Sequence, residues 1–375
     1  MKYRLLPLLL SISLCTTGCL RTNILEQTGL IVMVGFDKAA DDQIQGTSLL
    51  YQIDPRAKEK TQVITSVAAS SKGSRDLNNL GMAKRMVSGQ LRVALYSDEL
   101  VRQTGMLELA DTLSRDANVG RMLYVAICKG KALDLMSFRY PEASNLGTFL
   151  YQDLKQNAKN GTLPSSTLHE FIRDYYEIGR DPVLPILEKE ERKVVISGIA
   201  LMRNDLMVGE VSPRSGYYIK VFRDQSIATN LEVRLKSSEL QPMLKTKPKK
   251  AQTAVVITTL KQHGKIKLTD PKKLNFDISL KINAEMLEIS EQVDLSNPET
   301  EPRIAQLVSR QLTRELQQLL DRCIAKQTDP IGLGEVYRAS VRHSLLNRGQ
   351  WHRMLSNVHV TPHVDVTFVR SGVVE

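Results

Sequence analysis

Short apolar runs separated by polar turns dominate the first half of the chain and predict strands. Leu30 to Phe36 and Thr47 to Ile53 flank the polar segment 37–42, a pattern that predicts a β-hairpin. Further strands are predicted from Leu91 to Tyr96 and from Met122 to Cys128. Helical spacing appears between these runs, so the pattern indicates a region in which strands and helices alternate.

Four helices are predicted around these strands. Ser74 is expected to cap a helix that runs toward Val87, and Ser97 a second helix with two carboxylates in its first turn. Carboxylates in that position favour the positive end of the helix dipole. The other two helices are predicted from Leu146 to Asn157 and from Ser165 to Tyr176.

The second half of the chain is richer in strand patterns and contains the longest helix signal. Apolar residues recur at three- and four-residue steps from Pro302 to Gln327, which predicts one long helix packed on a sheet; an exposed helix for a partner subunit is the alternative. The final strand is predicted from Val358 to Val369, and Pro362 favours a sheet edge. The other predicted strands are Val194 to Met202, Tyr217 to Phe222, Val255 to Leu260, Lys265 to Leu268 and Phe276 to Ile282.

A run of six charges from Glu188 to Lys193 separates the two halves and predicts a domain boundary. We predict an N-terminal mixed α/β domain over residues 19–190 and a C-terminal mixed α/β region over residues 191–375. Residues 191–250 and 251–375 are candidate subdomains of that region. The predicted fold class is α+β or mixed α/β, with antiparallel and mixed sheets and the long C-terminal helix packed on a sheet.

The first residues have the layout of an export signal. Two basic residues precede an apolar run from Leu5 to Leu14, and small residues then lead to Cys19. The run is shorter than the roughly 20 residues that span a bilayer. We expect cleavage between Gly18 and Cys19, removal of the signal peptide 1–18 together with Cys15, and S-diacylglycerol and N-acyl groups on Cys19. Ordinary secretion and an uncleaved membrane stub are the alternatives.

Composition is ordinary for a globular protein, and the charge is positive. The 375 residues are 42% apolar and 25% charged, with a formal charge of +10. On an exported protein this excess favours anionic lipid headgroups. Export argues against nucleic acid as a partner, and the 5% aromatic content leaves little for base stacking.

Nine lysines and one acidic residue lie between Lys245 and Lys273. A solvated surface is the simpler explanation of this segment. Contact with an anionic surface, either lipid or wall polymer, is the second explanation. The candidate residues for that contact are Lys245, Lys247, Lys249 and Lys250.

Known catalytic and metal-binding motifs are absent from the sequence. Residues 332–334 lack the full phosphate-loop pattern and predict a turn. His359 and His363 would lie about 13 Å apart in a strand, whereas a shared zinc needs both nitrogens near 2.1 Å. We therefore predict no enzyme activity, no catalytic residue, no cofactor and no metal. Cys128 and Cys323 are predicted to be separate buried thiols, with a disulfide between them as the alternative.

Several segments resemble, in order, one known family. After Cys19 these are ILEQTGLIVMVGFDKAADD, LYSDELVRQTGMLELADTLSRDANVG, VAICKGKALDLM, VVISGIALMRNDLMVGEV, AKQTDPIGLGEVYRASV and VHVTPHVDVTFVRSG. Together they resemble the Ger(x)C family, the lipoprotein C subunits of spore nutrient germinant receptors. The resemblance extends from Cys19 to about Gly372. Leu20 and Thr16 depart from the tryptophan and leucine that are common at these positions.

The resemblance implies consecutive mixed α/β domains. It also implies a location on the outer face of the inner spore membrane, beside integral-membrane partner subunits of the same receptor. The family brings no established catalytic residue, so Cys19 alone is carried over as a defined position. A solute-binding lipoprotein of a transport system is the main alternative from another class, and an envelope enzyme is the third possibility. A solute-binding lipoprotein normally has two similar lobes, whereas the two halves of this chain differ.

Overall fold

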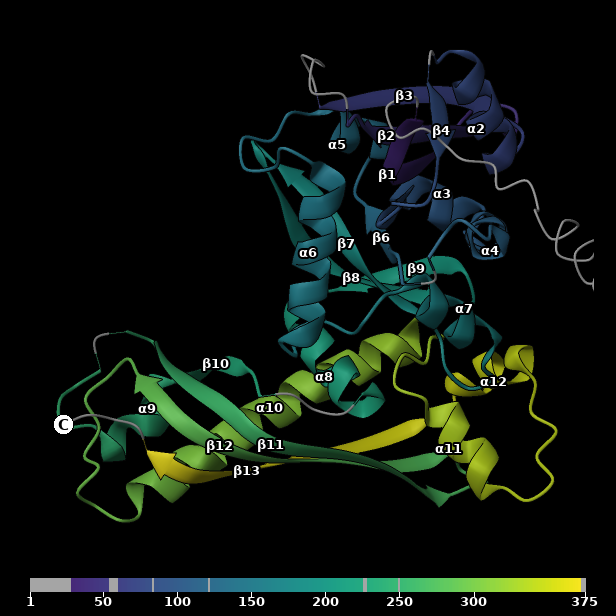
Figure 1. Cartoon of the computed structure of the whole chain (residues 1–375). Helices are drawn as coiled ribbons and strands as arrows, with labels where there is room; N and C mark the ends of the chain where they lie inside the picture. Colours follow the sequence, from purple (N-terminus) through teal and green to yellow (C-terminus); the bar gives the residue numbers. More distant parts are fainter. Residues whose placement is uncertain are drawn as a thin grey trace, which may run out of the picture.

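The computed structural model describes residues 28–53, 60–82, 84–120, 122–224, 228–248 and 250–371. The predicted signal peptide, Gly18, Cys19 and Lys249 lie outside these residues. Two sheets organise the described chain, a nine-stranded mixed sheet and a four-stranded sheet (Figure 1). The predicted mixed α/β class is confirmed.

Strand polarity changes across the nine-stranded sheet, whose order is β3-β2-β1-β5-β6-β7-β8-β9 with β4 paired to β1. The central strands β1, β5, β6 and β7 are parallel, and antiparallel hairpins extend the sheet on both sides. The hairpin predicted around residues 37–42 is confirmed. The strands are β1 (Thr28–Lys38), β2 (Ile44–Tyr51), β3 (Thr61–Ala68), β4 (Arg85–Val87), β5 (Val93–Ser97), β6 (Tyr124–Cys128), β7 (Val183–Glu190), β8 (Lys193–Arg203) and β9 (Leu206–Val211).

Helices pack on both faces of this sheet. One apolar cluster joins it to α3 (Asp98–Gln103), α4 (Leu107–Arg115) and α7 (Leu168–Tyr176). A second cluster, on the opposite face, joins it to α5 (Ala132–Ser137) and α6 (Leu146–Lys159). Because both faces are covered, every residue of β5 and β6 is buried, which explains their unbroken apolar sequence.

The four-stranded sheet, in the order β10-β11-β12-β13, carries the long helix α10 (Thr300–Ala325) on one face. Both the helix and its packing are confirmed. β13 is an edge strand, as predicted from Pro362, and the structure shows that it runs parallel to β12. Ser309 Oγ and Thr313 Oγ1 of α10 accept hydrogen bonds from the edge amides of Val366 and Val364 at 2.9 and 3.1 Å. The strands are β10 (Asn230–Lys236), β11 (Gln252–Asp270), β12 (Asn275–Ile289) and β13 (His359–Ser371).

Helix α8 (Pro213–Arg223) lies between the two sheets and contacts β8 and β11 (Figure 1). The boundary predicted after residue 190 falls in the turn between β7 and β8, which are paired neighbours in the first sheet. The division predicted after residue 250 lies between β10 and β11, which are also paired. The remaining short elements are α9 (Ser237–Leu240), η2 (Gln241–Met243), α11 (Leu333–Ser340) and α12 (Arg348–Leu355).

The strand predicted from Tyr217 to Phe222 is wrong, because these residues belong to α8. Pro213 occupies the first helical turn, where its missing N–H costs little. Residues 216–221 are all buried because the helix lies between two sheets. Burial on every side removes the polar positions that would have revealed a helical period.

Two other local predictions need correction. Helix α2 (Ser71–Leu80) is capped by Ser70, whose Oγ accepts from Gly73 N at 3.1 Å; Ser74 is inside the helix and Val87 is in β4. The two strands predicted between residues 255 and 268 form the single strand β11. Ser97 precedes α3 as predicted, but its side chain makes no capping hydrogen bond.

Candidate functional site

A set of buried polar side chains connects the two sheets. We call it the buried junction, and it comprises Asp174, Asp181, Arg223, Asp329, Trp351 and His352. Asp329, which is 1% exposed, is at its centre. Its carboxylate accepts hydrogen bonds from the amides of Gly332, Leu333 and Gly334 at 2.8 to 3.0 Å and from Trp351 Nε1 at 2.9 Å. Burial raises the pKa of Asp329 to about 6.

Asp181, which precedes β7, links the first sheet to Asp329. The amide of each aspartate donates to the other residue: Asp181 N to the Asp329 carbonyl, and Asp329 N to Asp181 Oδ2, both at 2.8 Å. His352 Nε2 lies 3.0 Å from both carboxylate oxygens of Asp181. Segments from three distant parts of the sequence are therefore held at one point.

Arg223, at the end of α8, supplies the cation of the junction. Its Nη1 lies 2.9 Å from Asp174 Oδ2, and both side chains are nearly inaccessible. Its Nε and Nη2 donate to the carbonyls of Pro330 and Asp181. Burial lowers the pKa of Arg223, and the charge of Asp174 opposes that shift. The guanidinium thus joins α7, α8 and the Asp329 segment.

Two glycines allow the chain segments of the junction to approach closely. A Cβ on Gly179, which has φ +97°, would lie 2.3 Å from the Gly334 carbonyl carbon, so a larger residue would force the segments apart. Gly332 adopts φ +86° and begins α11. This turn lets three consecutive amides face one carboxylate, an arrangement that usually binds an anion and here binds Asp329.

The polar groups of the buried junction bind one another and thereby connect the two sheets. Its carboxylates are occupied by protein donors, so it offers no open position at which a reacting group would bind. Within the described residues, no three His, Cys, Asp or Glu side chains are grouped as a metal site would require. None of the six residues of the buried junction was predicted as a site residue from the sequence. The available signals were the only tryptophan of the chain, Trp351, and the Asp-Pro-Ile-Gly-Leu-Gly sequence that begins at Asp329.

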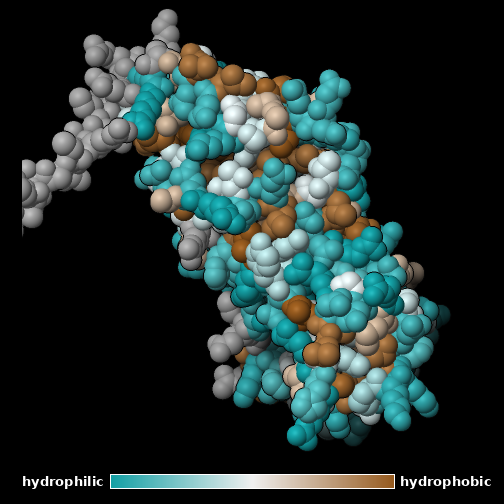
Figure 2. Space-filling view, turned by 90° about the vertical axis from the view of Figure 1, so that its right-hand side faces the viewer, coloured by the Kyte–Doolittle hydropathy of each residue, from teal (hydrophilic) through white to brown (hydrophobic). Residues whose placement is uncertain are grey.

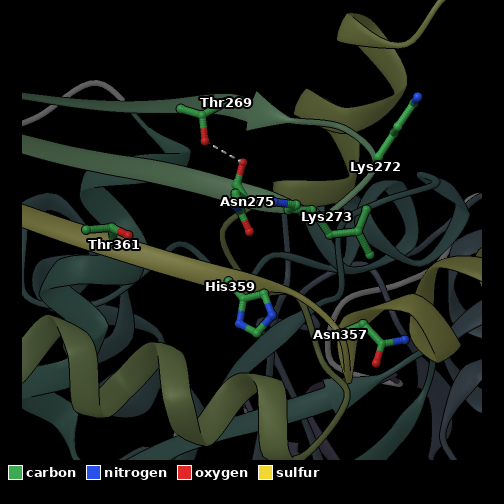
Figure 3. A pocket seen from close by; sticks show the side chains of 8 residues that line it. Thr269, Lys272, Lys273, Asn275, Asn357, His359 and Thr361 are labelled. Carbon is green, nitrogen blue, oxygen red and sulfur yellow. Dashed lines mark hydrogen bonds between the residues drawn. The ribbon is translucent and has the colours of Figure 1, made fainter.

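A surface hollow of about 790 Å³ lies at the turn between β11 and β12. Lys272 and Lys273, at the end of the lysine-rich segment, line this hollow together with His359 of β13 (Figure 3). Lys272 extends away from the other labelled side chains. The cations therefore do not converge on one point in this hollow.

The structure separates the other predicted residues. Lys245, Lys247 and Lys250 are exposed before β11, and His359 and His363 are exposed on β13. No described helix is long and apolar enough to cross a bilayer.

The cysteine prediction is confirmed, since Cys128 and Cys323 are buried free thiols in separate clusters. Burial raises the pKa of both thiols well above the usual range.

Comparison with known proteins identifies the family to which the chain belongs. The family model described as the spore germination protein N-terminal domain matches residues 21–189. The model described as spore germination B3/GerAC-like, C-terminal matches residues 197–372. The chain therefore belongs to the Ger(x)C family of spore germination proteins.

Individual relatives agree with this assignment. The spore germination protein GerQC of Bacillus cereus is 27% identical over 381 residues, covering 100% of both chains. Spore germination protein A3 of Bacillus subtilis is 26% identical over 230 residues, 59% of this chain and 61% of that one. The crystal structure of the GerBC protein shares the fold, with a TM-score of 0.56 and 16% identity over 90% of this chain and 96% of that chain.

Proposed function

We propose that this chain is a lipid-anchored, non-enzymatic subunit of a spore nutrient germinant receptor. It would assemble with the integral-membrane subunits of that receptor on the outer face of the inner spore membrane. The observation that carries the proposal is the pair of family matches, which together span residues 21–189 and 197–372. The matched region begins at Arg21, two residues after Cys19, the residue at which we place the lipid.

Anchoring at Cys19 would hold the folded body close to the membrane. Eight residues separate Cys19 from Thr28, the first residue of β1, and the nine Cα-to-Cα steps reach at most about 30 Å when fully extended. A diacylglycerol with a further N-acyl chain exceeds the single chain that gives only marginal membrane binding. Such an anchor would keep the nine-stranded sheet close to the proposed partner subunits.

The buried junction supports a role in transmitting conformational change. It fixes the segment before β7 to the segment that begins α11, so a displacement of one sheet moves the other. A solute-binding lipoprotein remains the rival. Its two similar lobes do not match a nine-stranded and a four-stranded sheet of different topology.

Affinity isolation from cross-linked spore membranes tests the proposed assembly. A tagged chain is expected to bring down integral-membrane receptor subunits in comparable amounts. A tagged membrane protein of unrelated function, expressed at the same level, is the control. Recovery of the chain without any integral-membrane partner would contradict the proposal.

The predicted contact between the lysine-rich segment and an anionic surface can be tested separately. Replacing Lys245, Lys247, Lys249 and Lys250 with glutamine is expected to weaken binding to anionic vesicles at low salt at least tenfold, since each basic residue near such a surface contributes about 1 kcal/mol. Sedimentation of unlipidated chain with vesicles measures this. The control is Lys155→Gln with Lys159→Gln on α6. Equal binding by both variants would show that this segment is only a solvated surface.

A further inference from the structure

Helix α2 packs on the first sheet with its polar side facing inward. Ser74 and Asn78 are 1% and 3% exposed, whereas Leu77 and Leu80 are 47% and 84% exposed. A helix on a sheet ordinarily buries its apolar face. The inverted polarity of α2 therefore requires polar partners on the inner side, because buried polar groups are costly without hydrogen bonds.

The two inward side chains differ in how well they are satisfied. Ser74 Oγ lies 2.8 Å from Ser66 Oγ and donates to the Gly46 carbonyl at 3.3 Å. Asn78 Nδ2 donates to the same carbonyl at 3.4 Å. Among the described residues, Asn78 Oδ1 has no hydrogen-bond partner. Asn78 Oδ1 is thus a buried acceptor without a protein donor, a feature that calls for an explanation.

Asn78 lines a cavity of about 840 Å³ between α2, α4 and the strands β1, β2 and β4. This volume is within the range of small-molecule sites. The β1 wall is mostly apolar, with Leu30, Ile31, Val34 and Phe36 beside the polar Thr28. The opposite wall is the polar face of α2. Figure 2 views the molecule from the side on which α2 and α4 lie in Figure 1, and apolar patches are mixed with hydrophilic groups there.

The charge at this cavity is predominantly positive. Its lining includes the four basic residues Lys72, Arg75, Arg85 and Arg115 and the two acidic residues Asp76 and Asp116. Arg75 uses Nη1 for its contacts with Asp116, at 2.6 Å, and with Ser88. It precedes Asn78 by three residues and so lies on the same side of the helix. A negatively charged group near Arg75 can reach the rest of its guanidinium.

We propose that this cavity binds a small amphiphilic anion. The apolar body of the ligand lies against β1, an N–H or O–H group donates to Asn78 Oδ1, and the negative group lies beside Arg75. This binding site does not depend on the proposed receptor function. A result that contradicts one proposal therefore leaves the other untouched.

The test uses the fluorescent probe 1-anilinonaphthalene-8-sulfonate, which combines an aromatic body, one N–H donor and a sulfonate. Full-length chain carrying Cys19→Ser, and therefore free of lipid, is titrated with the probe. Saturable binding at one site is expected. Asn78→Leu and Arg75→Gln should each raise Kd at least tenfold, and Val34→Phe, which fills the cavity, should abolish saturable binding. Leu80→Ala, on the outer side of α2, is the matched control and should leave Kd unchanged.

Thermal unfolding separates lost binding from lost structure. Asn78→Leu removes an unpaired buried acceptor together with the long hydrogen bond from Nδ2 to the Gly46 carbonyl, which still accepts from Ser74 Oγ, so its unfolding temperature should stay close to that of the parent. Weaker probe binding by such a stable variant supports the site. Absence of saturable binding by the parent, or equal Kd values in the parent and all three cavity variants, would overturn the proposal.

Discussion

Replacing Asp329 with alanine is expected to lower the free energy of unfolding by about 4 kcal/mol, at roughly 1 kcal/mol for each of four buried N–H donors that lose their acceptor. Chemical denaturation of the full chain measures the change. Asp277→Ala is the matched control because Asp277 is exposed on β12, and such a substitution changes stability by only about 0.5 kcal/mol. Equal effects of the two substitutions would show that the buried junction does not hold the sheets together.

The pH dependence of stability gives a second measure of the same carboxyl. Burial raises the pKa of Asp329 from 3.8 to about 6, so the folded state binds its proton more tightly than the unfolded state. The stability from this difference is present below pH 4 and is lost as the pH rises through 6. The parent should show this decrease, and Asp329→Ala should lack it. Identical pH profiles for the two proteins would contradict the pKa shift.

Replacing Cys19 with alanine is expected to move the protein from the membrane fraction to the soluble fraction. The substitution removes the attachment point for every acyl chain, and stable anchoring requires more than one such chain. Fractionation followed by immunoblotting measures the distribution. Cys15→Ala is the matched control, since Cys15 is expected to leave with the signal peptide and its loss should leave the protein membrane-bound. Retention of the Cys19→Ala protein on the membrane would mean that partner contacts suffice.

The sequence predicted elements well where one side of an element faces solvent. The alternating pattern of β13 and the apolar face of α10 both lie against the same core, and each appears in the sequence as a clear period. α8 was mistaken for a strand because it is buried on all sides and shows no period. The pattern of polar and apolar residues thus indicates which side of an element faces solvent. It distinguishes a helix from a strand only where one side is exposed.

The functional positions were harder to predict because they depend on contacts between distant residues. Asp181 and Asp329 are 148 residues apart in sequence, and the Asp-Pro-Ile-Gly-Leu-Gly sequence that begins at Asp329 does not show which distant residue pairs with it. Asn78 was not predicted as a site residue. Ser74 was expected to cap the helix from outside it, so the sequence did not show that Ser74 and Asn78 lie together on the inward-facing side of α2. Such sites become visible only when the packing of each side chain is known.

The most direct test of the receptor assignment is nutrient-induced germination of spores that lack this chain and every redundant receptor. We predict that these spores fail to respond to nutrients. Restoring the parent chain together with its own receptor partners should restore the response, and restoring the Cys19→Ala chain in the same way should leave it impaired. Normal germination of the spores that lack the chain, toward every nutrient tested, would contradict the central claim.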